Sequence, residues 1–436
     1  MKFEVENLGA IKKGEFEIGE LTIFTGSNNA GKTYITLLIS GLYNHISRNF
    51  FKLNKDEIDF FVKNKYLKLS LSDLMGKLNN NIKKLTDEFY KNLGKFYSYD
   101  DKFFKNTIID FKISDNFIKD VKSNLCKNEN FAKNEFEINE DELIKIYIEN
   151  DYLYISHSMK EEVPYFVVES ILSGILIKNS FVFPSVREGL NLFKNELNIN
   201  RTVLIDEIMS SNSNKPLNPI KLMDKMLSKY PRPISEYIQF INSVEGGRKE
   251  VKNKNFVDSV VDIAGGSYTY ENTQIYFKPK GKSSPKLPLH MASSTARAMA
   301  GIYFWFKYEE EYDFLVFDEP ELNLHPDNQR KMAKLICEIV NSGTKVIIST
   351  HSPFIITEIN NMTMLKDSKL SKTMKKKMGY TEIHELDIKK IQPYLINSNT
   401  IEKLNFKKDG IDMGLFNEAI DSMNQNNNKL YYSLGD

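Results

Sequence analysis

The residues with the clearest chemical potential form one short run, Gly26-Ser27-Asn28-Asn29-Ala30-Gly31-Lys32-Thr33. Gly26 and Gly31 allow the backbone to curl, so that successive N–H groups point at a single anion. Lys32 is placed to reach the β and γ phosphates of a nucleotide, and the Thr33 hydroxyl is placed to bind Mg²⁺. The run therefore predicts a phosphate-binding loop.

The sequence on both sides of this loop supports that interpretation. Residues Leu21 to Thr25 form an apolar run typical of a buried strand, and apolar residues recur at helical spacing from Tyr34 to Leu42. The order of strand, loop and helix brings the positive end of a helix to the phosphates. A glycine-rich turn with a chance lysine is the alternative, and the flanking elements disfavour it.

Two carboxylates end a second apolar run, which spans Phe314 to Phe317. A strand parallel to the loop strand would bring Asp318 beside the Mg²⁺, as a direct or water-mediated ligand. Glu319 would then lie near the γ phosphate, where it could orient or deprotonate the attacking water. An acidic turn before a proline is the alternative, and the presence of the glycine loop makes the catalytic interpretation stronger.

A third apolar run, Val346 to Ser349, is followed by Thr350 and His351. A neutral imidazole at that strand end can hydrogen-bond the γ phosphate or the water. A single histidine is more often structural, but its place after the acidic strand favours a catalytic role. The sequence thus predicts Lys32, Glu319 and His351 as catalytic residues.

Small hydroxyl residues begin an apolar stretch at Ser293 and Ser294. They are typical of a helix N-cap. They could also form a second anion site for a γ phosphate held by another copy of the chain, in which case ATP would join two protomers.

Composition restricts the classes of protein that are possible. The chain has 436 residues, of which 41% are hydrophobic and 27% charged, with a net charge of +1. Such a balance is typical of a globular protein and gives no overall attraction to nucleic acid. No apolar run is long enough to cross a bilayer, and the two cysteines lack metal-ligand spacing, so we expect a cytoplasmic protein without structural zinc.

The elements that must position these residues predict an α/β fold with long insertions. We expect a mixed sheet with flanking helices and an antiparallel β subdomain. We expect six segments: a first lobe with the glycine loop (1–49), a mainly helical insertion (50–140), a continuation of the core (141–189), a second helical insertion (190–255), a lobe with the hydroxyl, acidic and histidine motifs (256–360), and a C-terminal extension (361–436).

Together these motifs resemble the ABC-type ATPase heads of the RecF, SMC and OLD group. The resemblance covers about Met1–Leu42 and Phe181–Asn360 and includes the stretch Glu319-Pro320-Glu321-Leu322-Asn323-Leu324-His325-Pro326. It implies that Lys32 and Thr33 are Walker A residues, that Asp318 and Glu319 are Walker B residues, and that His351 is the switch histidine. The segment at Met291-Ala292-Ser293-Ser294 departs from the family's Leu-Ser-Gly-Gly-Gln signature.

The segment Phe183-Pro184-Ser185-Val186-Arg187 resembles a Pro-x-x-Arg segment of stand-alone bacterial ATPases of this group. The resemblance implies that Arg187 could contact phosphate or organise the interface between protomers, and a surface salt bridge is the alternative.

The resemblance also suggests a biological role. The chain lacks transporter spans, long SMC arms and an evident C-terminal nuclease, and it looks like the stand-alone ATPase subunits of anti-phage systems of the PARIS, Septu and retron types. This implies an oligomeric, ATP-hydrolysing sensor that controls a separately encoded effector such as a nuclease. The alternatives are a RecF-like DNA clamp, which would use Lys366, Lys372 and Lys375–Lys377, and a nucleotide-gated scaffold.

Overall fold

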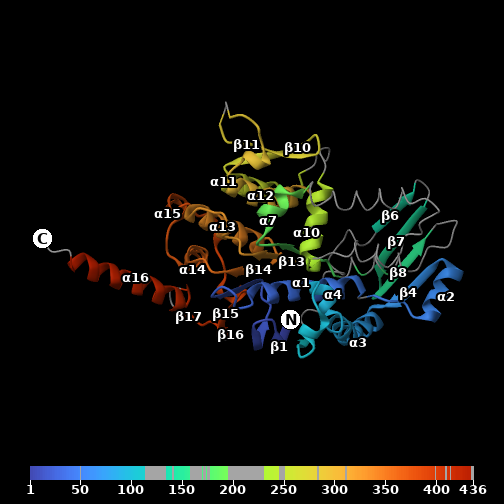
Figure 1. Cartoon of the computed structure of the whole chain (residues 1–436). Helices are drawn as coiled ribbons and strands as arrows, with labels where there is room; N and C mark the ends of the chain where they lie inside the picture. Colours follow the sequence, from blue (N-terminus) through green and yellow to red (C-terminus); the bar gives the residue numbers. More distant parts are fainter. Residues whose placement is uncertain are drawn as a thin grey trace, which may run out of the picture.

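A nine-stranded mixed sheet runs through the centre of the molecule (Figure 1). The computed structural model describes residues 1–49, 51–112, 134–139, 142–157, 169, 173, 177–194, 230–244, 251–281, 284–309, 312–397, 399–407, 410–412 and 414–433. From one edge to the other the strands are β5 (Ile108–Lys112), β1 (Lys2–Leu8), β2 (Ile11–Glu17), β16 (Thr400–Lys403), β15 (Ile391–Asn397), β3 (Leu21–Gly26), β14 (Lys345–Thr350), β13 (Phe314–Asp318) and β9 (Ser180–Phe183).

Five neighbouring strands of this sheet are parallel. β15, β3, β14, β13 and β9 all run in one direction, so their carboxyl ends meet at one edge. β14 lies between the glycine-loop strand β3 and the acidic strand β13. The other strands include the antiparallel pairs β1–β2 and β1–β5. The predicted α/β fold with a mixed sheet is therefore confirmed.

Helices cover both faces of the parallel strands. Helix α1 (Lys32–Asn49) packs on one face, and helices α11 (Lys254–Ala264), α12 (Ser294–Tyr308), α13 (Pro326–Asn341) and α14 (Pro353–Asp367) contribute to the core on the other. Successive strand residues alternate between the two cores: Val316 belongs to the first, while Leu315 and Phe317 belong to the second. Strands buried on both faces read as continuous apolar runs, which explains why the sequence revealed them.

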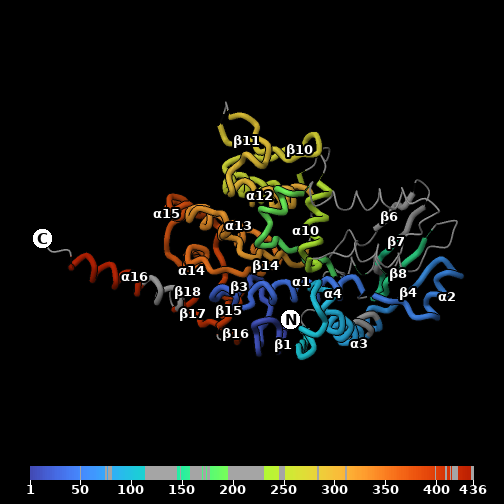
Figure 2. The backbone as a smooth tube through the Cα atoms, viewed as in Figure 1, coloured from blue at the N-terminus to red at the C-terminus, as the bar shows by residue number. Residues whose placement is uncertain are grey.

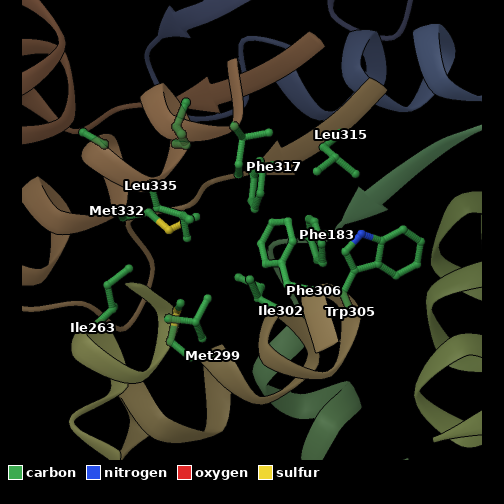
Figure 3. Close-up of a cluster of buried hydrophobic side chains, with 14 of the residues drawn as sticks. Phe183, Ile263, Met299, Ile302, Trp305, Phe306, Leu315, Phe317, Met332 and Leu335 are labelled. Atoms are coloured by element: carbon green, nitrogen blue, oxygen red, sulfur yellow. The ribbon is translucent and has the colours of Figure 1, made fainter. Parts of the chain in front are cut away.

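Figure 3 shows part of the second core. Phe183 and Phe317, from neighbouring strands, stack with their ring centroids 4.6 Å apart. Trp305 and Phe306 of α12 point toward these strands from the helix below (Figure 3). This packing positions α12, with Ser293 and Ser294 at its start, against the sheet.

The segment 50–140, expected to be mainly helical, contains strands as well. Its described part includes helices α2 (Lys55–Asn64), α3 (Leu71–Tyr90) and α4 (Leu93–Tyr97), together with β4 (Tyr66–Ser70), β5 and β6 (Asn134–Asn139). β5 extends the main sheet beside β1. β4 and β6 form a four-stranded antiparallel sheet with β7 (Glu142–Glu149) and β8 (Tyr152–His157), and Asn150 and Asp151 form the tight turn between β7 and β8.

Other sequence predictions fall at the border of the described residues. The sequence pattern also predicts a helix from Pro164 to Ile177, and most of that stretch lies outside the described residues. Most of the segment 190–255 lies outside them as well, apart from the end of helix α7 (Arg187–Leu192), helix α10 (Arg232–Ser243) and the residues beside them. The expected antiparallel β subdomain contains the hairpin of β10 (Gly266–Glu271) and β11 (Gln274–Pro279), and β11 also pairs with β12 (Leu287–Pro288).

The C-terminal segment 361–436, expected to be an extension, contributes two strands to the main sheet. After helix α15 (Lys372–Lys377), β15 enters the main sheet directly beside β3, and β16 follows it. Short strands β17 (Phe406–Lys407) and β18 (Gly410–Ile411) then lead to helix α16 (Gly414–Ser433), which projects away from the rest of the molecule (Figures 1 and 2). Among the helices in the described ranges, none has the length and apolarity needed to cross a bilayer.

Candidate nucleotide site

The glycine loop follows β3 and enters helix α1, as the sequence predicted. Gly26 has φ = 144°, and a Cβ atom there would lie 2.2 Å from the carbonyl oxygen of Ile396 in β15. Only glycine tolerates both that conformation and that contact. Gly31 also has positive φ, at 104°. The loop backbone thus has the curl that an anion-binding loop needs.

The Lys32 side chain lies within this loop. Its Nζ donates hydrogen bonds to the carbonyl oxygens of Gly26, at 3.0 Å, and Ser27, at 2.9 Å. Burial lowers the pKa of Lys32, and the nearby carboxylates of Glu319, Glu321 and Asp318 oppose that effect. The side chain is therefore a desolvated cation held among acids, a setting in which a phosphate would be a strong partner.

Thr33 and Asp318 meet where α1 and β13 approach each other. The Thr33 hydroxyl lies 3.2 Å from both carboxylate oxygens of Asp318. The hydroxyl of Ser349, on the intervening strand β14, donates a hydrogen bond to Asp318 Oδ1. A hydroxyl and a carboxylate are the hard oxygen donors that Mg²⁺ prefers, and the ion commonly takes its other ligands from phosphates and water. The residues present fit a Mg²⁺ site.

Glu319 has an unusual backbone for its residue type, with φ = 48°. Its N–H donates to the carbonyl oxygen of Ser349 at 3.0 Å, which ties the turn to β14. A left-handed conformation in a residue other than glycine or asparagine is uncommon and clusters at functional sites. The Glu319 carboxylate stays partly exposed, with 23% of its side chain accessible, so it can reach water.

Arg187 hydrogen-bonds to the main chain of this acidic turn, a role that the sequence did not predict. Its side chain is fully buried and donates to the main-chain oxygens of Asp318 at 3.1 Å, Glu319 at 3.2 Å and Pro320 at 3.2 Å. The surface salt bridge considered from the sequence is therefore wrong, and burial also keeps the guanidinium from a partner protomer. The rarity of fully buried arginine explains why sequence reasoning missed this role.

His351 follows β14, as predicted, and reaches the acidic turn. Its Nδ1 lies 3.7 Å from Glu319 Oε1 and 3.3 Å from Glu321 Oε1. Together with Ile23, Thr25, Gly26, Ser27 and Asn28, His351 lines a cavity of about 600 Å³. The glycine loop, the two carboxylates and the histidine are therefore brought together at one edge of the sheet.

A family comparison agrees with this arrangement. The model of the AAA ATPase domain family, AAA_15, matches residues 1–356 of the chain. The chain belongs to this ATPase family. No curated protein sequence matches it.

Solved structures similar to this AAA_15 chain include two SMC head domains. The head domain from Pyrococcus furiosus, with an extended coiled coil and bound to the C-terminal domain of ScpA, shares 14% identity at a TM-score of 0.35, over 97% of this chain and 98% of that one. The head domain from Thermotoga maritima shares 10% identity at a TM-score of 0.33, over 93% and 98% of the two chains.

Ser293 and Ser294 of the AAA_15 chain lie at the start of α12. Ser293 is the N-cap and accepts a hydrogen bond from the Ala296 N–H at 3.2 Å. Both serines are exposed, and within the described chain no hydrogen bond or ion pair joins them to residues 26–33. The capping role is confirmed, and the second anion site remains a prediction.

The lysines considered for DNA binding are partly neutralised. Acidic residues pair with three of them: Lys366 with Asp387, Lys372 with Glu382, and Lys375 with Glu385. Pairing reduces the positive potential that a phosphate backbone would meet. Three of the five lysines considered for DNA binding are thus charge-balanced.

Proposed function

We propose that this chain binds ATP with Mg²⁺ and hydrolyses it to ADP and phosphate. The observation that carries the proposal is the contact of the Thr33 hydroxyl with both oxygens of Asp318, at 3.2 Å, directly beside the buried cation of Lys32. A P-loop ATPase needs this juxtaposition, because the hydroxyl and the carboxylate must face one Mg²⁺ while the lysine faces the phosphates.

In this proposal each loop residue has a defined task. The N–H groups of residues 26–33 bind the phosphates, and Lys32 exchanges its two loop carbonyls for phosphate oxygens. Thr33 and Asp318 would hold a Mg²⁺ ion, which would supply positive charge beside the phosphates. The binding residues are Gly26, Ser27, Asn28, Asn29, Ala30, Gly31, Lys32 and Thr33.

The second task is to activate water. Glu319 is the general base: it lies one residue beyond Asp318 and remains accessible to solvent. His351 would contact the γ phosphate or the water from the neighbouring strand end. Arg187 and Ser349 fix the main chain of the acidic turn, so the two carboxylates keep separate roles.

We further propose that the site is completed by a second copy of the chain. Ser293 and Ser294 are exposed at the start of a 15-residue helix, where N–H groups and hydroxyls can receive a γ phosphate from another protomer's loop. The arrangement would be a head-to-tail dimer with nucleotide between the protomers. ATP binding would then drive assembly, and hydrolysis would release it.

The resemblance to anti-phage ATPases supports a sensor role for this oligomer. In that role a phage-derived trigger acts on the ATPase, which controls a separate effector, such as a nuclease. The test begins with purified full-length protein: phosphate release from ATP that disappears in the Glu319→Gln variant supports hydrolysis. DNA binding that falls steeply with added salt would favour a clamp, and oligomers without phosphate release would favour a scaffold.

A further inference from the structure

Glu321 is a buried carboxylate in the site to which the proposed hydrolysis assigns no task. Its side chain is only 4% exposed. Its Oε1 accepts hydrogen bonds from the Thr350 hydroxyl at 2.9 Å and from the His351 main-chain N–H at 2.7 Å. Burial raises the pKa of Glu321, and these hydrogen bonds and His351 oppose the rise. Burying a carboxylate is costly, so its position calls for a reason.

The imidazole of His351 supplies that reason. Its Nδ1 lies 3.3 Å from Glu321 Oε1, but without hydrogen-bond geometry. Both this buried nitrogen and the buried Oε2 of Glu321 lack hydrogen-bond partners in the structure. Two buried polar atoms without partners, on side chains in contact, are a costly arrangement that a small rotation of the ring would relieve.

We propose that Glu321 is a positioning residue for His351, accepting the Nδ1–H of the imidazole and so directing Nε2 toward the bound nucleotide. The two ring nitrogens lie on opposite edges of the imidazole, so anchoring one edge orients the other. His351 lines the cavity beside Gly26, Ser27 and Asn28, where the nucleotide phosphates are proposed to lie. A carboxylate behind a histidine commonly fixes its tautomer and orientation. The inference rests on the proposed ATPase function.

Glu319 is the other carboxylate near the ring, but it suits a different task. It lies farther from Nδ1, at 3.7 Å, and 23% of its side chain is exposed. Glu321, by contrast, is held in place by two hydrogen bonds. Anchoring His351 on Glu321 leaves Glu319 free to act on water. Glu319 would therefore act on water, and Glu321 would orient His351.

The test is a double-variant cycle on ATP hydrolysis with Glu321→Gln, His351→Ala and the combined variant. Glu358→Gln is the matched control, because Glu358 is also buried and pairs with Arg330 outside the site. We expect Glu321→Gln to lower kcat about tenfold while KM changes less than about twofold. The combined variant should be no slower than His351→Ala, because Glu321 acts only through the ring.

Nitrogen NMR of histidine-labelled protein gives a readout that does not depend on turnover or on the folding of the Glu321→Gln variant. The chain has six histidines, so the signal lost in His351→Ala identifies that ring. We expect wild-type Nδ1 to carry a hydrogen-bonded proton. An unprotonated Nδ1, a wild-type kcat in Glu321→Gln, or multiplied losses in the combined variant would overturn the proposal. Wild-type protein that releases no phosphate would instead refute the ATPase function, while the spectrum still decides the role of Glu321.

Discussion

The guanidinium of Arg187 donates to the carbonyl oxygen of Glu319 at 3.2 Å from a fully buried position. The same group also reaches the carbonyl oxygens of Asp318 and Pro320. It therefore fixes the main chain of the acidic turn, including the left-handed conformation of Glu319. Arg187 of helix α7 thus stabilises the backbone of Glu319, the proposed catalytic base.

Replacing Arg187 should damage both stability and activity. Arg187→Met removes the side-chain donors from the carbonyl oxygens of Asp318, Glu319 and Pro320, of which Glu319 keeps a bond from the Leu322 N–H. We expect the free energy of unfolding to fall by about 3 kcal/mol. Arg187→Lys should recover only part of this, because an ammonium has fewer donors in a different geometry. Urea unfolding measures the effect. The control Arg48→Met removes a half-exposed pair with Glu236 and should cost less than about 1 kcal/mol. Equal decreases in the free energy of unfolding for Arg187→Met and Arg48→Met would contradict the role of Arg187.

Lys32→Ala should weaken ATP binding. Loss of a charge-assisted hydrogen bond to phosphate is expected to raise the Kd by about 10- to 100-fold. Lys13, whose side chain is 79% exposed, provides the control, and Lys13→Ala should bind normally. Fluorescent nucleotide titration measures both constants. Normal affinity in Lys32→Ala would count against the phosphate-binding loop.

Asp318→Asn should change the requirement for Mg²⁺. The amide keeps the shape of the side chain but removes the charge that pairs with the ion, so half-maximal activity should need roughly tenfold more Mg²⁺. A Mg²⁺ titration of phosphate release at saturating ATP checks this. Unchanged Mg²⁺ dependence would remove Asp318 from the metal site.

Glu319→Gln should separate binding from hydrolysis. The amide cannot accept a proton from water, so we expect kcat to fall by about 10²- to 10⁴-fold while ATP affinity is kept. The closed dimer should accumulate, which light scattering in the presence of ATP would detect. Glu382→Gln, an exposed glutamate paired with Lys372, is the control and should hydrolyse normally. Wild-type turnover in Glu319→Gln would exclude Glu319 as the base.

The sequence predicted the parallel core because its strands are buried on both faces. Leu315, Val316 and Phe317 all face one core or the other, so no polar alternation interrupts the run. The strand ends then placed Asp318 and His351 at one edge of the sheet. Sequence spacing could not reveal Arg187, because its place depends on how α7 packs against α12 and so brings the side chain to the end of β13.

Strand β15 was missed for a specific reason. Pro393 lies within it, and proline normally argues against a central strand because it cannot donate to the ladder. Pro393 is nevertheless opposite Ile23 of β3. β15 also shapes the candidate nucleotide site, because its Ile396 carbonyl oxygen leaves no room for a side chain at Gly26 of the glycine loop.

The most direct test of a site shared between two protomers combines two inactive variants. Lys32→Ala disables the loop, and Ser294→Arg is expected to block the exposed start of α12 while leaving ATP binding intact. The control Ser72→Arg changes an exposed serine in the first turn of α3 and should stay active.

Each of the two variants should be inactive alone. In an equimolar mixture, half of the dimers would pair the two variants, and each of these would contain one intact composite site. We therefore predict that mixing restores phosphate release to about a quarter of the wild-type rate. A mixture that stays inactive, or a Ser294→Arg protein that hydrolyses ATP normally by itself, would contradict the shared site.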